Sequence, residues 1–198
     1  APVTGEVHGR VSTDGAVWEL GVTARSGAGR LDLARLGAVP IAGGELAVQM
    51  QPRGAVLRQV RLRLAGPEAP TLTASGSVTR NDAGWTMQAR LGLDALPAAG
   101  LGAWWPEGVA PGARAWVVEN VTAGTARNGA WEIAAEAPAD LSDLRVTEAR
   151  GAVEVADATV HWLRPIPPAE GVHGRVLFGL DAVTVEALRK RVRSAMDR

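Results

Sequence analysis

The chain has 198 residues, 46% of them hydrophobic, which is long enough for a substantial core and unlike a disordered tail. Its 21 basic and 21 acidic residues cancel and are spread along the chain, so the basic patch typical of nucleic-acid binding is absent. Cysteine is absent too, which excludes disulfides and thiolate metal sites.

Residues 1–96 are dominated by alternation of apolar and polar side chains. This pattern predicts half-exposed strands, because every second side chain of a strand lies on one face. Turn sequences rich in Gly, Asn and Asp separate the runs at 13–15, 26–29, 51–54 and 81–84. The prediction is an antiparallel β-meander. Its apolar positions are Trp18, Leu20, Val22, Leu62, Leu64, Trp85, Met87 and Leu91.

One short run inside this region is ambiguous. The apolar spacing of residues 31–36 fits a strand at first and a helical turn afterwards. Both interpretations remain open at this point.

Residues 97–124 form a connection rich in tryptophan and proline. Pro111 suits a first helical turn, and Ala113, Trp116, Val117 and Val121 fall on one stripe. These features predict a short amphipathic helix over 111–121, with Gly124 as its left-handed C-terminal residue.

Residues 125–184 return to alternation and predict further strands after a turn at 127–129. Their in-phase apolar positions continue past 150 to the end of this region. The apolar positions selected in this region are Trp131, Ile133, Val176 and Phe178. Residues 185–198 have the composition of a basic amphipathic helix. The Val-Thr-Val sequence at 183–185, where this tail begins, is instead typical of a strand.

A five-residue sequence occurs twice. Val7-His8-Gly9-Arg10-Val11 is identical to Val172-His173-Gly174-Arg175-Val176. The match is either chance in a chain rich in these residues or a repeated structural unit. The second interpretation suits a sheet that continues beyond both ends of the chain, with any membrane anchor or export signal outside it.

Patterns typical of catalysis or metal binding were sought along the chain. His8, His161 and His173 fall in strand-like runs and are not spaced as metal ligands. The serines of 74–77 lack a nucleophile elbow, and the glycines of 27–30 lack the rest of a phosphate-binding loop. We therefore expect no enzyme activity, no metal and no cofactor.

Seven tryptophans occur beside one phenylalanine and no tyrosine. Indole rings bury a large area, so these side chains could fill a core. They could equally line an apolar surface that contacts a ligand. The sequence leaves both interpretations open for the four tryptophans that lie in phase with apolar strand faces.

Two blocks in the second half carry a resemblance to a known family. The first consists of Leu96-Pro97, Trp104-Trp105-Pro106-Glu107-Gly108 and Arg114-x-Trp116-Val117-x-x-Asn120-x-x-x-Gly124. The second is a strand over 155–163, a proline-rich corner at 165–168 and a strand from 171. Together they resemble the AsmA-like bacterial envelope proteins, in particular the YhdP-type branch.

The resemblance implies an elongated, twisted antiparallel sheet curled into a groove, and the meander of residues 1–96 forms part of it. The 111–121 helix then plugs or gates the groove, or simply covers a sheet edge. It also implies a periplasmic location, anchorage in the inner membrane, and transport of phospholipid between the two membranes with acyl chains in the groove. The twelve apolar positions given above are then the groove-lining candidates. Envelope protein partners are unspecified.

A second hypothesis keeps the fold and drops the ligand. A closed sandwich or solenoid would pack its apolar faces together and serve as a structural or assembly scaffold of the envelope. The two hypotheses differ in whether the apolar positions are sealed in a core or left accessible.

Overall fold

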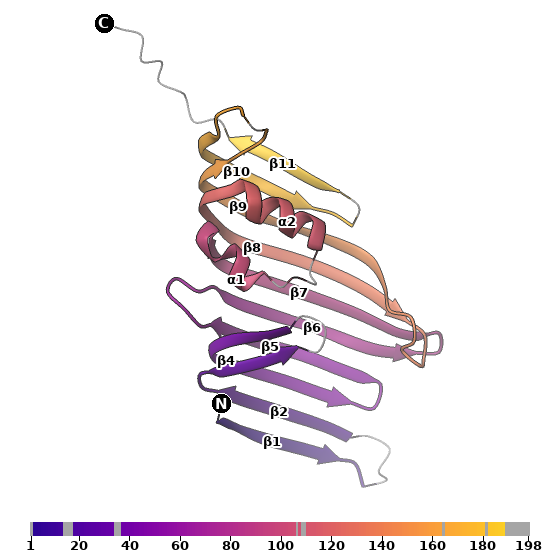
Figure 1. Ribbon diagram of the computed structural model, residues 1–198. Coiled ribbons are helices and arrows are strands. Elements are labelled where there is room, and N and C mark those ends of the chain that lie inside the picture. The colour runs from indigo at the N-terminus through magenta and orange to yellow at the C-terminus, as the bar shows by residue number, and fades with distance from the viewer. Residues whose placement is uncertain are drawn as a thin grey trace, which may run out of the picture.

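The computed structural model describes residues 2–13, 18–33, 37–105, 107, 110–163, 165–180 and 182–188. Within them, eleven strands form one antiparallel sheet (Figure 1). The strands are β1 Val3–Val11, β2 Trp18–Ser26, β3 Gly29–Leu33, β4 Gly37–Gln51, β5 Gly54–Leu64, β6 Thr71–Asn81, β7 Gly84–Pro97, β8 Val121–Ala137, β9 Arg145–Val160, β10 Ala169–Phe178 and β11 Val183–Leu188.

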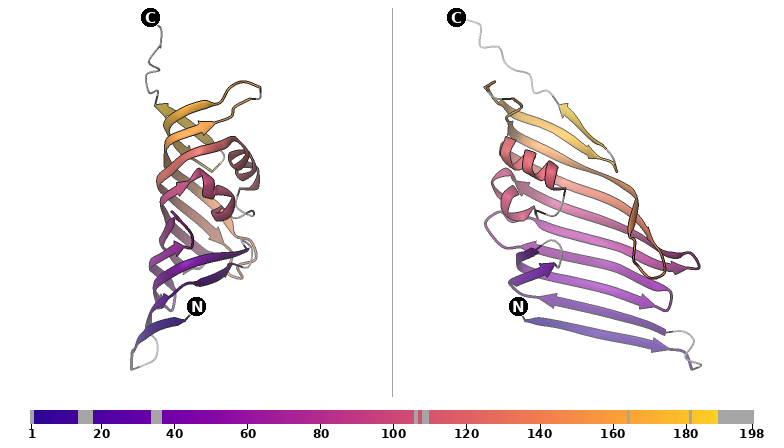
Figure 2. Two further views of the ribbon diagram at one scale, coloured as in Figure 1. Left: turned by 60° about the vertical axis from the view of Figure 1, so that its left-hand side comes forward. Right: turned by 45° about the vertical axis from the view of Figure 1, so that its right-hand side comes forward.

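The strands follow one another across the sheet in nearly the order of the sequence. The path runs β1-β2-β4-β5-β6-β7-β8-β9-β10-β11, and β3 pairs with the first part of β4. Figure 2 shows a twisted sheet with α1 (Leu101–Trp104) and α2 (Pro111–Asn120) on one side, and β3 with the first part of β4 stands on this side as well (Figure 1). The predicted mainly β, antiparallel fold is confirmed. The sheet is open and does not close into a barrel, and its curling into a groove stays a prediction.

The tight turn between β6 and β7 shows how the local sequence makes a hairpin. The side-chain oxygen of Asn81 accepts hydrogen bonds from the N–H groups of Ala83 and Gly84, both at 2.9 Å. Gly84 has a positive φ of 144°, and a Cβ there would lie 2.2 Å from the carbonyl oxygen of Ala137. Only glycine therefore fits this position.

The predicted turn at 127–129 is wrong, because β8 runs without a break through these residues. Asn128 has a left-handed φ of 53°, and the pairing of β8 with β9 shifts by one residue between Arg127 and Ala130. The Asn-Gly signal marks a β-bulge here instead of a chain reversal.

The helical connection also differs from its prediction. A 3-10 turn (η1, Ala98–Gly100) and the four-residue α1 precede α2, so the described residues contain two α-helices. Helix α2 ends at Asn120, whose side-chain N–H donates to the carbonyl of Trp116 at 2.9 Å. Gly124 lies inside β8, where its φ of 102° lets it approach Ala158 of β9, so its role as the helix C-cap is wrong.

The predicted apolar stripe of α2 is not packed as a stripe. No residue of α2 is buried, and Trp116 is 46% exposed. The helical spacing of the apolar residues predicted the helix correctly, but it did not predict which side of the helix would face the sheet.

Three smaller expectations have clear outcomes. Residues 31–33 of the ambiguous run are strand, while 34–36 lie outside the described residues. The strand-like start of the C-terminal tail is part of β11, and 189–198 lie outside the described residues. His161 and Trp162, expected in strands, follow the end of β9.

Buried hydrophobic side chains are few for a sheet of this size. Within the described residues they are Ile41, Leu64, Leu101, Ala135, Ala137, Val153 and Ala158. Three of these seven are alanines. The molecule therefore lacks a thick core, and most of its strand side chains remain partly accessible.

Candidate functional site

Strand register places the predicted apolar positions on a common face. Residues directly opposite each other in antiparallel strands point to the same face. Leu91 of β7 is opposite Trp131 of β8, Trp131 is opposite Gly151 of β9, and Gly151 is opposite Phe178 of β10. One row of side chains therefore crosses four strands.

A second row extends the same face to the N-terminal strands. It runs from β1 to β8 through Val7, Val22, Val48, Leu57, Gly76, Ala89 and Ile133. Side chains alternate along each strand, and a bulge between Leu57 and Val60 of β5 brings Leu62 and Leu64 back to the same side as Leu57. All twelve candidates therefore fall on this side of the sheet. We call it the apolar face, defined by Trp18, Leu20, Val22, Leu62, Leu64, Trp85, Met87, Leu91, Trp131, Ile133, Val176 and Phe178.

Further residues complete the apolar face that the sequence did not assign to it. On the described strands they include Val7, Val11, Leu46, Val48, Leu57, Val60, Leu72, Leu93 and Val153. The alternation of Leu46, Val48 and Met50 is visible in the sequence. It was missed because the glycines at 43 and 44 break the pattern just before it.

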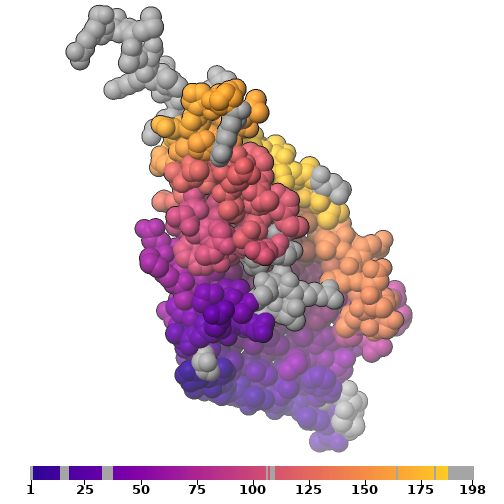
Figure 3. Space-filling model, viewed as in Figure 1, coloured from indigo at the N-terminus to yellow at the C-terminus, as the bar shows by residue number. Residues whose placement is uncertain are grey.

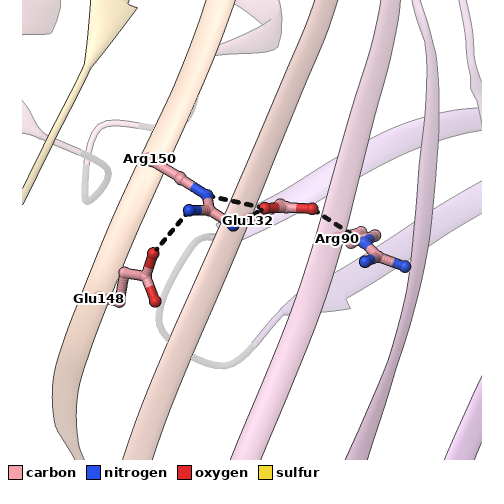
Figure 4. A network of polar contacts seen from close by, with 4 residues as sticks. All are labelled: Arg90, Glu132, Glu148 and Arg150. Atoms are coloured by element: carbon pink, nitrogen blue, oxygen red, sulfur yellow. Dashed lines mark hydrogen bonds and ion pairs between the residues drawn. The ribbon is translucent and has the colours of Figure 1, made fainter.

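The opposite face of the sheet is polar. Its central part carries a ladder of charges on β7, β8 and β9 (Figure 4). Arg90 Nε lies 3.0 Å from Glu132 Oε1, Arg150 Nη2 lies 2.6 Å from Glu132 Oε2, and Arg150 Nη1 lies 3.2 Å from Glu148. The hydrogen bond from Arg150, followed by that from Arg90, holds the pKa of the Glu132 carboxyl below its ordinary value.

Burial is uneven along the apolar face. Leu64 and Ile41, opposite each other at one end of β5, are both buried, and so is Leu101 of α1. Trp104 of α1 reaches this corner, since a Cβ on Gly66 would lie 3.3 Å from its ring. We call Ile41 and Leu64 the covered corner. In the space-filling view the helical residues stand over only part of the sheet (Figure 3).

An aromatic layer occupies the middle of the apolar face. The Trp131 ring lies over two glycines, because a Cβ on Gly151 or Gly129 would fall 2.1 or 2.5 Å from its atoms. The Trp131 and Phe178 ring centroids are 6.0 Å apart at an interplanar angle of 51°. A large ring thus covers strand positions that have no side chain, which stabilises glycine-containing strands.

The total accessible surface reflects this open arrangement. The whole chain exposes 13908 Å². A compact monomer of its mass, 20.6 kDa, would expose about 8,900 Å² by the usual scaling with mass. A sheet with one face left mostly without a second layer contributes to this excess.

Two open hollows in the described part of the chain lie over the N-terminal strands. One of about 400 Å³ is lined by polar-face residues that include Glu6, Arg25 and Glu45. The other, of about 610 Å³, is lined by residues that include His8, Arg10 and Arg58. Val22 lines the second hollow, and the other eleven candidates line neither. The apolar positions therefore form a broad surface outside these hollows.

The three histidines have separate surroundings. His8 lies 3.4 Å from Glu6, His173 lies 2.9 Å from Asp157, and His161 lies 3.4 Å from the Thr122 hydroxyl. Among the described residues, no three His, Cys, Asp or Glu side chains gather as a metal site would require. In the same part of the chain, no helix has the length and hydrophobicity needed to cross a bilayer.

Comparisons of the chain with protein-family models, with curated proteins and with solved structures find no match. The functional argument therefore depends on the chemistry of the two faces and of the sheet edges.

Proposed function

We propose that this chain is a non-enzymatic segment of a phospholipid-transfer protein of the bacterial envelope, and that acyl chains bind its apolar face. One observation carries the proposal: a continuous apolar face lies opposite a charged face, and Val7, Trp18 and Leu91 on the apolar face are 66%, 38% and 39% exposed. Monomeric soluble proteins rarely leave apolar patches larger than a few hundred Å² exposed. A lipid supplies the missing apolar layer.

The chemistry of the face suits an acyl chain better than a polar ligand. Its side chains are aliphatic or aromatic and offer few hydrogen-bond partners, so they select for hydrocarbon without fixing its position. Each CH₂ group removed from water contributes about 0.8 kcal/mol. Because neighbouring positions on the face are alike, a bound chain shifts from one to the next without losing contact area, which suits transfer.

The proposed setting follows the sequence resemblance to AsmA-like proteins of the YhdP-type branch. In that setting the segment lies in the periplasm as part of an inner-membrane-anchored protein, with the anchor outside this chain. Transfer between the two membranes would supply lipid for outer-membrane homeostasis. The open, sequentially ordered sheet is compatible with such a bridge.

Native mass spectrometry of the purified chain tests lipid binding. We expect phospholipid to co-purify and to be lost on Leu91→Glu, because a buried charge beside an acyl chain is costly. Leu91 is already partly exposed, so the fold should persist, which circular dichroism checks. Gln88→Glu is the matched control, since Gln88 lies on the polar face of the same strand.

Val22→Glu repeats the test on a distant strand of the apolar face and should also lower lipid retention. Lipid-free wild-type protein after mild extraction would overturn the proposal. Equal loss of lipid in Leu91→Glu and Gln88→Glu would also overturn it, because binding would then not depend on the face.

A scaffold without ligand is the second candidate, favoured by the exposure of Trp18, Leu46 and Leu91 on the apolar face of a single copy. In that case the apolar faces of two copies would cover each other. Light scattering would then show a stable lipid-free dimer that Leu91→Glu dissociates. A lipid-bearing monomer would exclude this candidate.

A further inference from the structure

Strand β1 is an open edge of the sheet. In the described residues it pairs with β2 on one side only, so the N–H and C=O groups of its other side face solvent. Its valines on the apolar face, Val3, Val7 and Val11, are 68%, 66% and 71% exposed. A nine-residue edge strand without proline is a site to which another strand readily adds.

The repeated sequence shows which kind of strand would fit. Val7–Val11 of β1 is identical to Val172–Val176 of β10, and both strands lead into a hairpin. In β1 the arginine of the repeat, Arg10, lies opposite Glu19 of β2. The sequence match therefore coincides with a match in structural position.

Arg175 is the equivalent arginine in β10, and it has a glutamate on each side. It lies opposite Glu186 of β11 and opposite Glu154 of β9. Arg10 has the first of these two neighbours in Glu19 but lies beside the open edge on its other side. The position occupied by β9 in one copy of the repeat is thus open in the other.

Strand β9 complements the repeated sequence in two further ways. Val153 lies opposite Val176 on the apolar face, and Val155 lies opposite Gly174. Asp157 Oδ1 lies 2.9 Å from Nε2 of His173. Apolar side chains on one face and carboxylates on the other therefore match both faces of the repeat.

We propose that the free edge of β1 binds an antiparallel strand of the β9 type, with valine opposite Val11 and glutamate opposite Arg10. Main-chain hydrogen bonds supply the affinity, and the valine and glutamate fix the register. This proposal is independent of lipid binding, because it concerns the edge of the sheet and not the occupant of its apolar face.

Cysteine cross-linking tests both the edge and the register. The chain has no cysteine, so a single introduced thiol is unique. The probe is a synthetic peptide of residues 151–160 carrying Val153→Cys, added to the full chain carrying Val11→Cys. Opposite residues in antiparallel strands have Cα atoms about 4.5–5.5 Å apart, a distance that a disulfide spans. We expect rapid formation of the mixed disulfide.

Arg10→Cys is the matched control, since its side chain points to the other face and should react at least tenfold more slowly. Val185→Cys places a thiol on the apolar face of the other edge strand, β11, and should also react slowly. Equal rates at Val11 and Arg10, or faster reaction at Val185, would overturn the proposal. So would a Val11→Cys homodimer as the main product.

A second measurement does not depend on the cysteine variants. NMR titration of the unmodified chain with the unmodified peptide should shift the amide signals of β1 more than those of β11. A peptide with Glu154→Lys should bind at least fivefold more weakly, because lysine then lies opposite Arg10. Absence of shifts at millimolar peptide, or equal binding of the lysine peptide, would overturn the proposal.

Discussion

Leu64 and Leu91 lie on the same apolar face, yet Leu64 is 5% exposed and Leu91 is 39% exposed. The difference arises because Leu64 lies opposite the buried Ile41, whereas Leu91 lies opposite Ala74 and Trp131, neither of which is buried. Identical side chains on one face therefore have two roles. At the covered corner they hold the fold together, and on the open part they are available to a ligand.

The largest expected effect comes from removing a side chain of the covered corner. Leu64→Ala should lower the free energy of unfolding by about 2–5 kcal/mol, because it leaves a cavity beside Ile41. Leu91→Ala, the same change on the open part, should cost less than about 1 kcal/mol. Urea unfolding followed by circular dichroism measures both. Equal losses would mean that the two regions do not differ in packing.

The aromatic layer lies between these extremes. Gly151→Ala places a methyl group against the Trp131 ring and should lower the free energy of unfolding by about 1–3 kcal/mol. The tryptophan fluorescence should change as the ring moves. Gly112→Ala in α2, where a Cβ meets nothing within 4 Å, is the control and should leave stability nearly unchanged or slightly higher. A neutral Gly151→Ala would show that the layer is loosely packed.

The bulge in β8 should have a smaller effect. Asn128→Val puts a β-branched residue at a φ of 53° and should lower the free energy of unfolding by about 1–2 kcal/mol. Asn128→Gly keeps the conformation but loses the hydrogen bond from the Asn128 side chain to Glu154, which is 2.8 Å long. Glycine should therefore cost less than valine in thermal unfolding. The reverse order would contradict the bulge.

The smallest effect is expected on the polar face. Since Arg150 and Arg90 hold the pKa of Glu132 below its ordinary value of 4.5, ionised Glu132 stabilises the fold above that pH. This contribution disappears as pH falls through the lower pKa of the folded state. The stability difference between wild type and Glu132→Gln should therefore shrink below pH 4.5 in acid unfolding.

Glu148→Gln is the control for this titration, because it removes only the outer contact of Arg150 and leaves both arginines on Glu132. Its difference from wild type should be the smaller one. A gap between wild type and Glu132→Gln that stays constant down to pH 3 would contradict the ionic contribution.

The sequence predicted the two-faced strands well because alternation is a local property. Trp85, Met87, Ala89 and Leu91 occupy every second position of β7, and the strand register puts them on the same side as Trp131 and Ile133. The 111–121 helix was predicted within one residue of its observed end for the same reason. It rests on Pro111 at the first turn and on local spacing.

The sequence failed where a local signal has two structural outcomes. Asn128-Gly129 suits a hairpin turn or a bulge, and only the pairing of β8 with both neighbours selects the bulge. Trp116 falls on the predicted stripe of α2 but is exposed, as are most side chains of this helix. Neither choice depends on residues near it in sequence.

The sequence by itself determined that this protein is built of antiparallel strands with one apolar and one charged side, since period-two patterning needs no distant partner. Only the tertiary structure decided which part of the apolar side is covered and which strand edges remain open. Those features depend on where α1 and the strand order bring distant residues together, and pairing between segments far apart in sequence leaves no local signal.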